Sequence, residues 1–287
     1  MTKGVLLFAH NNSDVDYGLM AIIAGGLAKK HLRVPVSLVT DKWTAKWLKE
    51  SDQYERAEEI FDQIIFVELP YTKNVRMLHD GFDGKVVPFV NSNRCDAYHL
   101  SPYDQTLLID SDYLIFSDRL NEYWDVDAGV LLAHSMNDIT GERGIILDRR
   151  VSETGIDLFW ATTVMFGKDQ ESQFFFDLVD FIKENYRYYA DLFRFNPRQY
   201  RNDISFSIAR HMMNSYEVDK IYTLPPLLTV FDKDILLDVD DHEKLTFLID
   251  KPQDCGNFWA STTNGVDVHI MNKQSIIRNK DKLLRLL

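Results

Sequence analysis

The stretch from Thr106 to Phe116 constrains the fold of this chain more than any other. Leu107 to Ile109 is an apolar run that is too short for a free-standing helix and is typical of a buried strand. The run ends abruptly at Asp110-Ser111-Asp112, and a second apolar run, Tyr113 to Phe116, follows at once. The pattern therefore predicts a buried strand with two carboxylates at its end.

Two carboxylates one residue apart at the end of a buried strand are costly to desolvate unless a cation neutralises them. Hard divalent cations such as Mg²⁺ and Mn²⁺ prefer carboxylate oxygens, and ligands of open α/β sheets bind at strand ends. Asp110 and Asp112 are therefore predicted metal ligands. The alternative, a turn that happens to contain Asp-Ser-Asp, stays open on the sequence alone.

Strand and helix patterns alternate at the start of the chain. Apolar runs typical of buried strands cover Val5–Ala9, Val34–Val39 and Ile64–Leu69. Helical periodicity covers Tyr17–Lys30 and Trp43–Glu50. This order is typical of a parallel sheet with right-handed crossovers. The predicted fold class is α/β, with a Rossmann-like, mostly parallel central sheet flanked by helices.

Polar residues follow the first two of these strands. No G-x-G-x-x-G follows the first strand and no P-loop occurs, so the sequence supports neither a dinucleotide-binding Rossmann site nor an NTPase. Hydrogen-bonding residues stand there instead and suit a nucleotide base and ribose: His10, Asn11, Asn12, Asp16, Tyr17 and Asp41. Any one of them could equally be a helix cap or a turn residue.

A Gly-rich segment from 71 to 90, which contains Gly81 and Gly84, is predicted to be an irregular loop. Asn91–Leu100 is a short helix candidate, and Arg94 lies in it, upstream of the central strand. The planar fork of an arginine suits a diphosphate or a sugar hydroxyl. A surface ion pair is the alternative for Arg94.

The second half of the chain adds further elements. Strands are predicted over these segments, the last of them as an acidic edge strand or hairpin: Gly129–Ala133, Phe159–Gly167, Val266–Met271 and Asp232–Asp240. Helices are predicted over these segments: Gln170–Tyr189, Arg201–Ala209 and Arg278–Leu287. His134–Ser152 is polar and Arg-containing, which suits a loop over a site.

The composition is that of a compact globular protein. The chain has 287 residues, of which 45% are hydrophobic, so it can bury a sizeable core. Its net charge of −12 argues against a globally basic nucleic-acid binder, although a local basic groove stays open. Cys95 and Cys255 are too few for a disulfide framework or a zinc site. Apolar runs are too short for a signal peptide or a membrane span, so we expect a cytoplasmic protein without membrane contact.

In their order along the chain, these motifs resemble those of nucleotide-sugar glycosyltransferases of the GT-A fold, particularly the glycogenin-like and bacterial galactosyltransferase group. The resemblance covers most of the chain and rests on these segments: Phe8–Asp16, Val39–Asp41, Arg94, Leu107–Asp112, Phe159–Lys168, Arg201–Asp203 and Asp267–Lys273. Two features depart from the group. Ala161-Thr162-Thr163 stands in place of its NSG, and His269 and Lys273 are four residues apart instead of following its H-x-x-G-x-x-K spacing. The opening also resembles glycosyltransferase-like proteins of tailed phages.

The resemblance implies one GT-A domain with a C-terminal extension, in which 1–118 form the nucleotide-binding half and 119–287 the acceptor half. It implies that Mn²⁺ or Mg²⁺ is held by Asp112 and His269, with Asp110 either as a further metal ligand or in contact with the ribose. A shared metal at about 2.0–2.2 Å from each ligand requires His269 to lie within about 5 Å of the Asp112 carboxylate.

The resemblance also assigns the donor-binding and catalytic residues. Arg94, Ser111 and Lys273 would contact the nucleotide sugar, together with the six polar residues that follow the first two strands. Asn202 and Asp203 would lie near the anomeric carbon, where Asp203 would stabilise the cationic sugar at the transition state. Either residue could instead simply cap the helix that starts there.

These inferences predict a metal-dependent glycosyltransferase that uses a nucleotide diphosphate sugar, first of all a UDP-linked one. The acceptor would be a hydroxyl of a glycan or small molecule. A hydroxymethylated base in phage DNA is the alternative, supported by arginines at 143–150 and 187–201 and opposed by the net charge. Two other classes stay open: a nucleotidyltransferase or phosphohydrolase, and a non-catalytic module that binds nucleotide sugars.

Overall fold

The computed structural model describes residues 1–69, 74–81, 83–126, 128–143, 149–153, 155–217, 221–251 and 257–287. Cys255 and residues 144–148 of the predicted polar loop lie outside these ranges. No helix in the described ranges has both the length and the apolar character that crossing a membrane requires.

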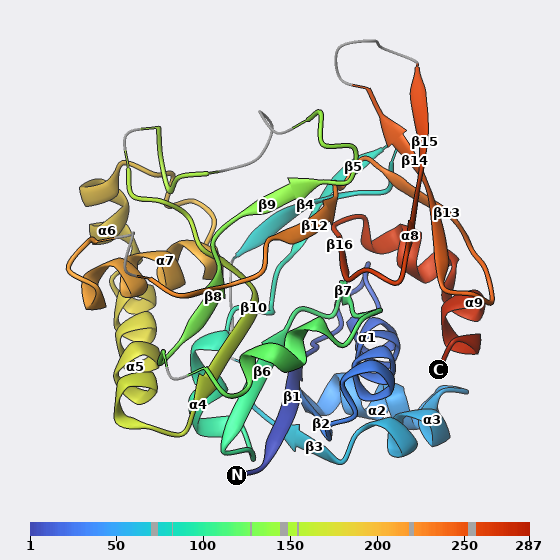
Figure 1. The fold of residues 1–287 in the computed structure, drawn as a ribbon, viewed down its shortest axis with the longest axis horizontal. Coiled ribbons are helices and arrows are strands. Elements are labelled where there is room, and N and C mark those ends of the chain that lie inside the picture. Colours follow the sequence, from blue (N-terminus) through green and yellow to red (C-terminus); the bar gives the residue numbers. More distant parts are fainter. Residues whose placement is uncertain are drawn as a thin grey trace.

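A seven-stranded sheet is the frame of the described part of the chain (Figure 1). Its strands follow the order β11-β8-β10-β6-β1-β2-β3. Their bounds are β1 (Lys3–Phe8), β2 (Val36–Thr40), β3 (Gln63–Phe66), β6 (Gln105–Ile109), β8 (Leu131–Ala133), β10 (Trp160–Gly167) and β11 (Thr223–Leu224). Only β10 runs against the others, because it pairs antiparallel with both β6 and β8. The predicted α/β class with a mostly parallel sheet is confirmed.

Helices flank this sheet on either side of its centre (Figure 1). Beside β1 to β3 lie α1 (Tyr17–Leu32), α2 (Lys42–Glu50) and α3 (Tyr54–Ile60). Beside β10 lie α5 (Gln170–Glu184), α6 (Tyr186–Phe193) and α7 (Asn202–Met213). Short helical turns connect strands at η1 (Arg94–Asp96), α4 (Ala97–Leu100) and η2 (Arg119–Tyr123). Because helices cover the sheet, Leu107 and Leu108 of β6 are fully buried, as their continuous apolar run predicted.

Two smaller sheets complete the C-terminal side. One has the order β7-β16-β12-β9, with β7 (Tyr113–Leu114), β16 (Val268–Ile270), β12 (Leu227–Val230) and β9 (Met136–Asp138). The other has the order β13-β14-β15, with β13 (Ile235–Val239), β14 (Lys244–Asp250) and β15 (Phe258–Asn264). The chain then ends in α8 (Lys273–Arg278) and α9 (Lys280–Arg285). The antiparallel β7–β16 pair sets His269 opposite Tyr113, directly after the carboxylates that follow β6.

A buried arginine ties the two smaller sheets together. Arg143 pairs with Asp138 at the end of β9 and, at 2.8 Å through two nitrogens, with Asp234 just before β13. The side chain of Arg143 is 5% exposed and both carboxylates are fully buried. Its guanidinium also lies over the Phe231 ring, 4.6 Å from the centroid. These contacts make Arg143 a structural residue at the junction of the sheets.

The prediction of an irregular loop at 71–90 is wrong for its described residues. They form a hairpin of β4 (Val75–His79) and β5 (Gly84–Pro88). Gly81 lies in the turn with a φ of 103°, a conformation that residues with a Cβ rarely adopt. A Cβ there would also lie 2.6 Å from the Ile235 side chain. Of the two glycines that suggested an irregular loop, Gly81 therefore lies in the turn between the strands and Gly84 begins β5.

Several element boundaries also need correction. The predicted helix at 170–189 ends at Glu184, and a second helix begins after Asn185, which occupies the position between them. The helix predicted to be capped by Asn202 or Asp203 has Arg201 at its N-cap, without a side-chain cap hydrogen bond. The polar segment 134–152 contains strand β9. The helix predicted over 278–287 is α9, which is shorter, and α8 precedes it. The acidic segment 232–240 contains β13, an edge strand as predicted.

Candidate functional site

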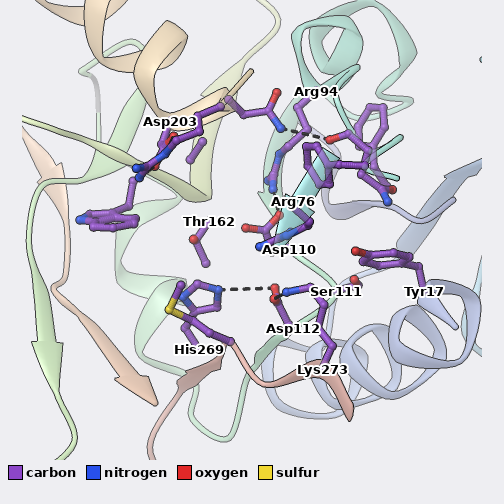
Figure 2. Close-up of a pocket in the computed structure, with 18 of the residues that line it drawn as sticks. Tyr17, Arg76, Arg94, Asp110, Ser111, Asp112, Thr162, Asp203, His269 and Lys273 are labelled. Atoms are coloured by element: carbon purple, nitrogen blue, oxygen red, sulfur yellow. Dashed lines mark hydrogen bonds and ion pairs between the residues drawn. The ribbon is translucent and has the colours of Figure 1, made fainter. Parts of the chain in front are cut away.

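A cavity of about 430 Å³ lies at the edge of the central sheet where β1 and β6 end (Figure 2). Its walls come from the turn after β6, the start of β10, the start of α7, the β16–α8 junction and strand β4. Ligands of open α/β sheets bind at this edge. The cavity contains most of the chemistry-bearing residues that the sequence singled out.

Asp110, Asp112 and His269 converge in this cavity (Figure 2). Each offers one ligand atom, and these atoms all lie within 4.8 Å of one another. His269 Nε2 is 3.5 Å from Asp112 Oδ1, inside the limit of about 5 Å set by a shared metal. The backbone holds this arrangement, because the Ile270 N–H donates to the Asp112 carbonyl at 2.9 Å.

The chemistry of these donors fits a divalent cation. Two carboxylates and an imidazole are ligands that Mn²⁺ accepts, and the carboxylates alone suit Mg²⁺. Nδ1 of His269 is buried and has no hydrogen-bond partner among the described residues. A metal-bound histidine usually donates a hydrogen bond from its other ring N–H. Among the described residues, His269 Nδ1 has no acceptor for such a bond.

Two cations contact the same carboxylates. Arg94 Nη1 contacts Asp110 Oδ1, and Lys273 Nζ contacts Asp112 Oδ2. Burial raises the pKa of Asp112, but the Lys273 ammonium and the hydrogen bonds from His269 and Lys273 outweigh burial and hold that pKa well below its usual range. Burial raises the pKa of Asp110, and the Asp112 charge adds to this effect against the Arg94 charge. The two carboxylates therefore differ, and Asp112 is the one held firmly ionised.

Arg94 is 4% exposed and forms an ion pair with Asp110. The alternative of a surface ion pair is therefore wrong, because the Arg94 side chain is buried. Its Nε and Nη2 atoms are buried and have no hydrogen-bond partner among the described residues. Leaving such donors unpaired is costly. Both belong to a residue that lines the cavity, where an anionic ligand would satisfy them.

The polar residues after β1 and β2 are engaged in structural hydrogen bonds. Asp16 caps α1 by accepting from Leu19 N at 2.9 Å, and Asp41 caps α2 by accepting from Trp43 N at 2.8 Å. His10 is fully buried, with its ring nitrogens 3.2 Å from Asp41 and from Asn93.

Asn11 and Asn12 serve the turn before α1. Asn11 accepts from Gly18 N at 2.7 Å, and Asn12 from Val15 N at 2.8 Å. Of the six residues predicted to contact the nucleotide at these strand ends, Tyr17 alone is among the described residues that line the cavity. A direct role of the other five in nucleotide binding stays a prediction.

The start of α7 brings Asn202 and Asp203 to the cavity wall. Figure 2 shows Asp203 there. Arg201 binds both oxygens of Asp203, at 3.1 Å from Nε and 2.5 Å from Nη2. Asn202 donates to the Asn91 carbonyl at 3.1 Å, whereas its Oδ1 is buried without a hydrogen-bond partner among the described residues. Asn202 therefore has a free acceptor for a ligand, and Asp203 is held as an ion pair.

Some cavity residues were missed by the sequence reasoning. Arg76 of β4 lines the cavity and lies 5.0 Å from the Phe89 ring centroid, and it forms no ion pair with a carboxylate of the described chain. Trp160 and Asp232 also line the cavity. The short alternation Val75-Arg76-Met77, followed by the apolar Leu78, is the sequence signal for a strand that could have placed Arg76.

Among solved structures, several glycosyltransferases resemble this chain at low sequence identity. No family model matches it, and no curated protein does. The apo-form glycosyltransferase GlyE of Streptococcus pneumoniae TIGR4 is 15% identical, with a TM-score of 0.45 over 78% of this chain. The chain spans only 45% of the length of that GlyE structure.

Two further structures have similar values. The galactosyltransferase LgtC, in complex with donor and acceptor sugar analogues, is 11% identical, with a TM-score of 0.43 over 72% of this chain and 70% of its own. The PaToxG glycosyltransferase is 12% identical, with a TM-score of 0.42 over 77% of this chain and 72% of its own. None of the three is described as a phage protein.

Proposed function

We propose that this protein is a metal-dependent glycosyltransferase of the GT-A type. It takes a sugar from a nucleotide diphosphate sugar, first of all a UDP-linked one, and transfers it to an acceptor hydroxyl. The observation that carries the proposal is the convergence of Asp110, Asp112 and His269 with Lys273 and Arg94 in one cavity. This set combines ligands for a divalent cation with cations for a diphosphate.

The proposed reaction needs this combination because the diphosphate gains negative charge as the glycosidic bond breaks. A divalent cation on Asp110, Asp112 and His269 would supply Lewis-acid stabilisation of that charge. The free nitrogens of Arg94 would donate to the phosphate oxygens, and Lys273 would add a mobile positive charge. Arg76 would neutralise a further part of the charge, since no carboxylate of the described chain pairs with it.

The cavity draws its residues from both proposed halves of the chain. The metal-binding carboxylates, Arg76 and Arg94 belong to 1–118, and Asn202, Asp203, His269 and Lys273 belong to 119–287. The start of α7 would face the sugar, where the free oxygen of Asn202 accepts from a sugar hydroxyl. A DNA base as acceptor stays a prediction, to be tested by salt-dependent binding of duplex DNA.

A panel of nucleotide diphosphate sugars tests the proposal by thermal unfolding with and without Mn²⁺. The correct donor should raise Tm by about 5 °C at a concentration of about 100 times its Kd, because it binds only the folded state. The rise should vanish in EDTA. Slow release of UDP from that donor, also lost in EDTA, would separate an enzyme from a non-catalytic binding module. Absence of any metal-dependent shift across the panel would contradict the proposal.

The stereochemistry of transfer should be retention. An inverting enzyme needs a carboxylate beside the acceptor hydroxyl to take its proton. Among the described residues of 119–287 that line the cavity, the carboxylates are Asp203 and Asp232, and Arg201 donates to both oxygens of Asp203. We assign Asp203 to the stabilisation of the cationic sugar at the transition state, with the leaving diphosphate as the proton acceptor.

The anomeric proton of the product, observed by NMR after transfer from a donor of known configuration, checks this prediction. A product with the donor's configuration is expected. An inverted product would refute retention and would make Asp203 or Asp232 the general base. The variants Asp203→Asn and Asp232→Asn would then show which of the two loses activity.

A further inference from the structure

We propose that Lys273 and the divalent cation compete for Asp112, so that the cation binds tightly only together with a diphosphate that draws Lys273 away. The inference rests on the proposed function and adds a coupling mechanism to it. Lys273 then acts as an internal counter-ion that a ligand must displace, in addition to any contact it makes with the diphosphate.

The contacts show that the carboxylates already have their counter-ions. Lys273 Nζ contacts Asp112 Oδ2, with the two side chains only 5% and 7% exposed. Arg94 Nη1 contacts Asp110 Oδ1, with the Arg94 side chain 4% and the Asp110 side chain 36% exposed. Two carboxylates and two cations sum to zero charge, and a neutral His269 leaves the sum unchanged. A divalent cation would therefore enter a balanced cluster and meet the repulsion of two buried positive charges.

Arg76 adds to this repulsion. It lines the same cavity, and no carboxylate of the described chain pairs with it. In the close-up it lies on the side of Asp110 (Figure 2). The positive charge of Arg76 would repel a cation bound at these carboxylates and would attract an anion or a cation–anion unit.

Of the two side chains that contact the Asp112 carboxylate, His269 and Lys273, Lys273 is the one that can move without breaking the fold. The backbone of Asp112 is bonded to Ile270, and His269 is held opposite Tyr113 by strand pairing. The backbone of Lys273 is fixed as well, because the preceding Asn272 caps α8 through Ser275 N at 3.0 Å. The lysine stem, however, has four rotatable carbons, so its ammonium can leave Asp112 by side-chain rotation.

A diphosphate would provide a new partner for the Lys273 ammonium. Its oxygens accept from Lys273 and at the same time neutralise the cation that takes the place on Asp112. The diphosphate then raises the affinity for the cation, and by linkage the cation raises the affinity for the diphosphate by the same factor. Cation and nucleotide diphosphate are therefore expected to bind as a unit.

Binding of Mn²⁺, followed by the EPR signal of the free ion with and without UDP, tests the competition in the full-length protein. The wild type should bind Mn²⁺ weakly alone and much more tightly with UDP. Lys273→Met removes the charge and keeps the length of the stem, so it should bind Mn²⁺ alone about tenfold more tightly or better. Its gain from UDP should shrink correspondingly.

Two further variants provide the controls. Lys273→Arg keeps the charge and should leave the affinity for Mn²⁺ alone near that of the wild type. Lys282→Met removes a lysine that pairs with Asp238 on the surface and should change neither affinity. If Lys273→Met does not fold, Lys273→Gln replaces it, with circular dichroism as the check of folding.

The outcomes separate the two proposals. If the wild type binds Mn²⁺ with UDP but the uncharged variant binds Mn²⁺ alone no more tightly, the competition is wrong and the proposed function stands. If the wild type binds no Mn²⁺ with or without UDP, both are wrong. A tighter site for Mn²⁺ in Lys273→Met, together with a smaller effect of UDP, establishes the competition.

Discussion

Replacing Asp112 with asparagine should lower sugar transfer by about 10²–10³-fold or more. The change removes a charged ligand of the metal, and the metal would stabilise the leaving diphosphate. The change is nearly isosteric, and the backbone contact of Asp112 with Ile270 is kept. Binding of Mn²⁺ in the presence of UDP should fall together with the activity. Transfer is measured with the donor found by thermal shift, and Mn²⁺ binding by EPR.

Some loss of stability is expected, because Asp112→Asn leaves the buried Lys273 ammonium without its charged partner, and circular dichroism should therefore show that the variant is folded in the assay. The matched control is Asp241→Asn, which changes a carboxylate that is 85% exposed and paired only loosely with Arg285. This control should keep full activity. Equal activity of Asp112→Asn and wild type, or activity that persists in EDTA, would exclude a metal-dependent reaction at this site.

Replacing Arg143 with methionine should destabilise the protein by about 3–5 kcal/mol, the loss typical of removing one partner from a buried charge cluster. Arg143 is the shared partner of Asp138 and Asp234, and both carboxylates are fully buried. Without it two buried negative charges lose their cation. Backbone N–H groups offset part of this loss, since Asp234 also accepts from Phe231 at 2.8 Å and from Asp250 at 3.0 Å.

Urea unfolding measures this change as a free energy. Arg150→Met is the matched control, because the Arg150 side chain is 59% exposed and its carboxylate partner lies 3.8 Å away. It should change stability by less than about 1 kcal/mol. Adding Asp138→Asn and Asp234→Asn to Arg143→Met should recover part of the loss, because the unpaired charges are then gone. Equal stability of Arg143→Met and Arg150→Met would contradict the structural role of the cluster.

The central strand and its carboxylates could be predicted from the sequence for a local reason. Leu107 to Ile109 is apolar without interruption because helices cover both faces of the sheet, and the run stops where the strand leaves it. Asp110 and Asp112 stand at that point, so their place at a strand end was determined by neighbours in the chain. The order of strands and helices in the first part of the chain was readable for the same reason.

Local pattern could not decide which polar residues would face the cavity. Asp16 and Asp41 satisfy the N–H groups at the starts of α1 and α2, a use that any polar residue at a helix start can have. The two glycines of its segment predict a loop, so the sequence pattern does not indicate the position of Arg76. Gly81 instead turns the chain between β4 and β5, and the hairpin then places Arg76 in the cavity wall.

The sequence by itself determined the α/β class, the buried central strand and the pair of carboxylates at its end. The reason is that a buried strand is recognisable as a run of consecutive apolar residues. Only the tertiary structure decided that His269 and Lys273 meet these carboxylates. That meeting depends on β16 pairing with β7, which joins residues far apart in the chain. It also decided that Lys273 contacts Asp112. The strength of an ion pair depends on the distance between the charges and on the exclusion of water, and neither can be read from the order of residues in the chain.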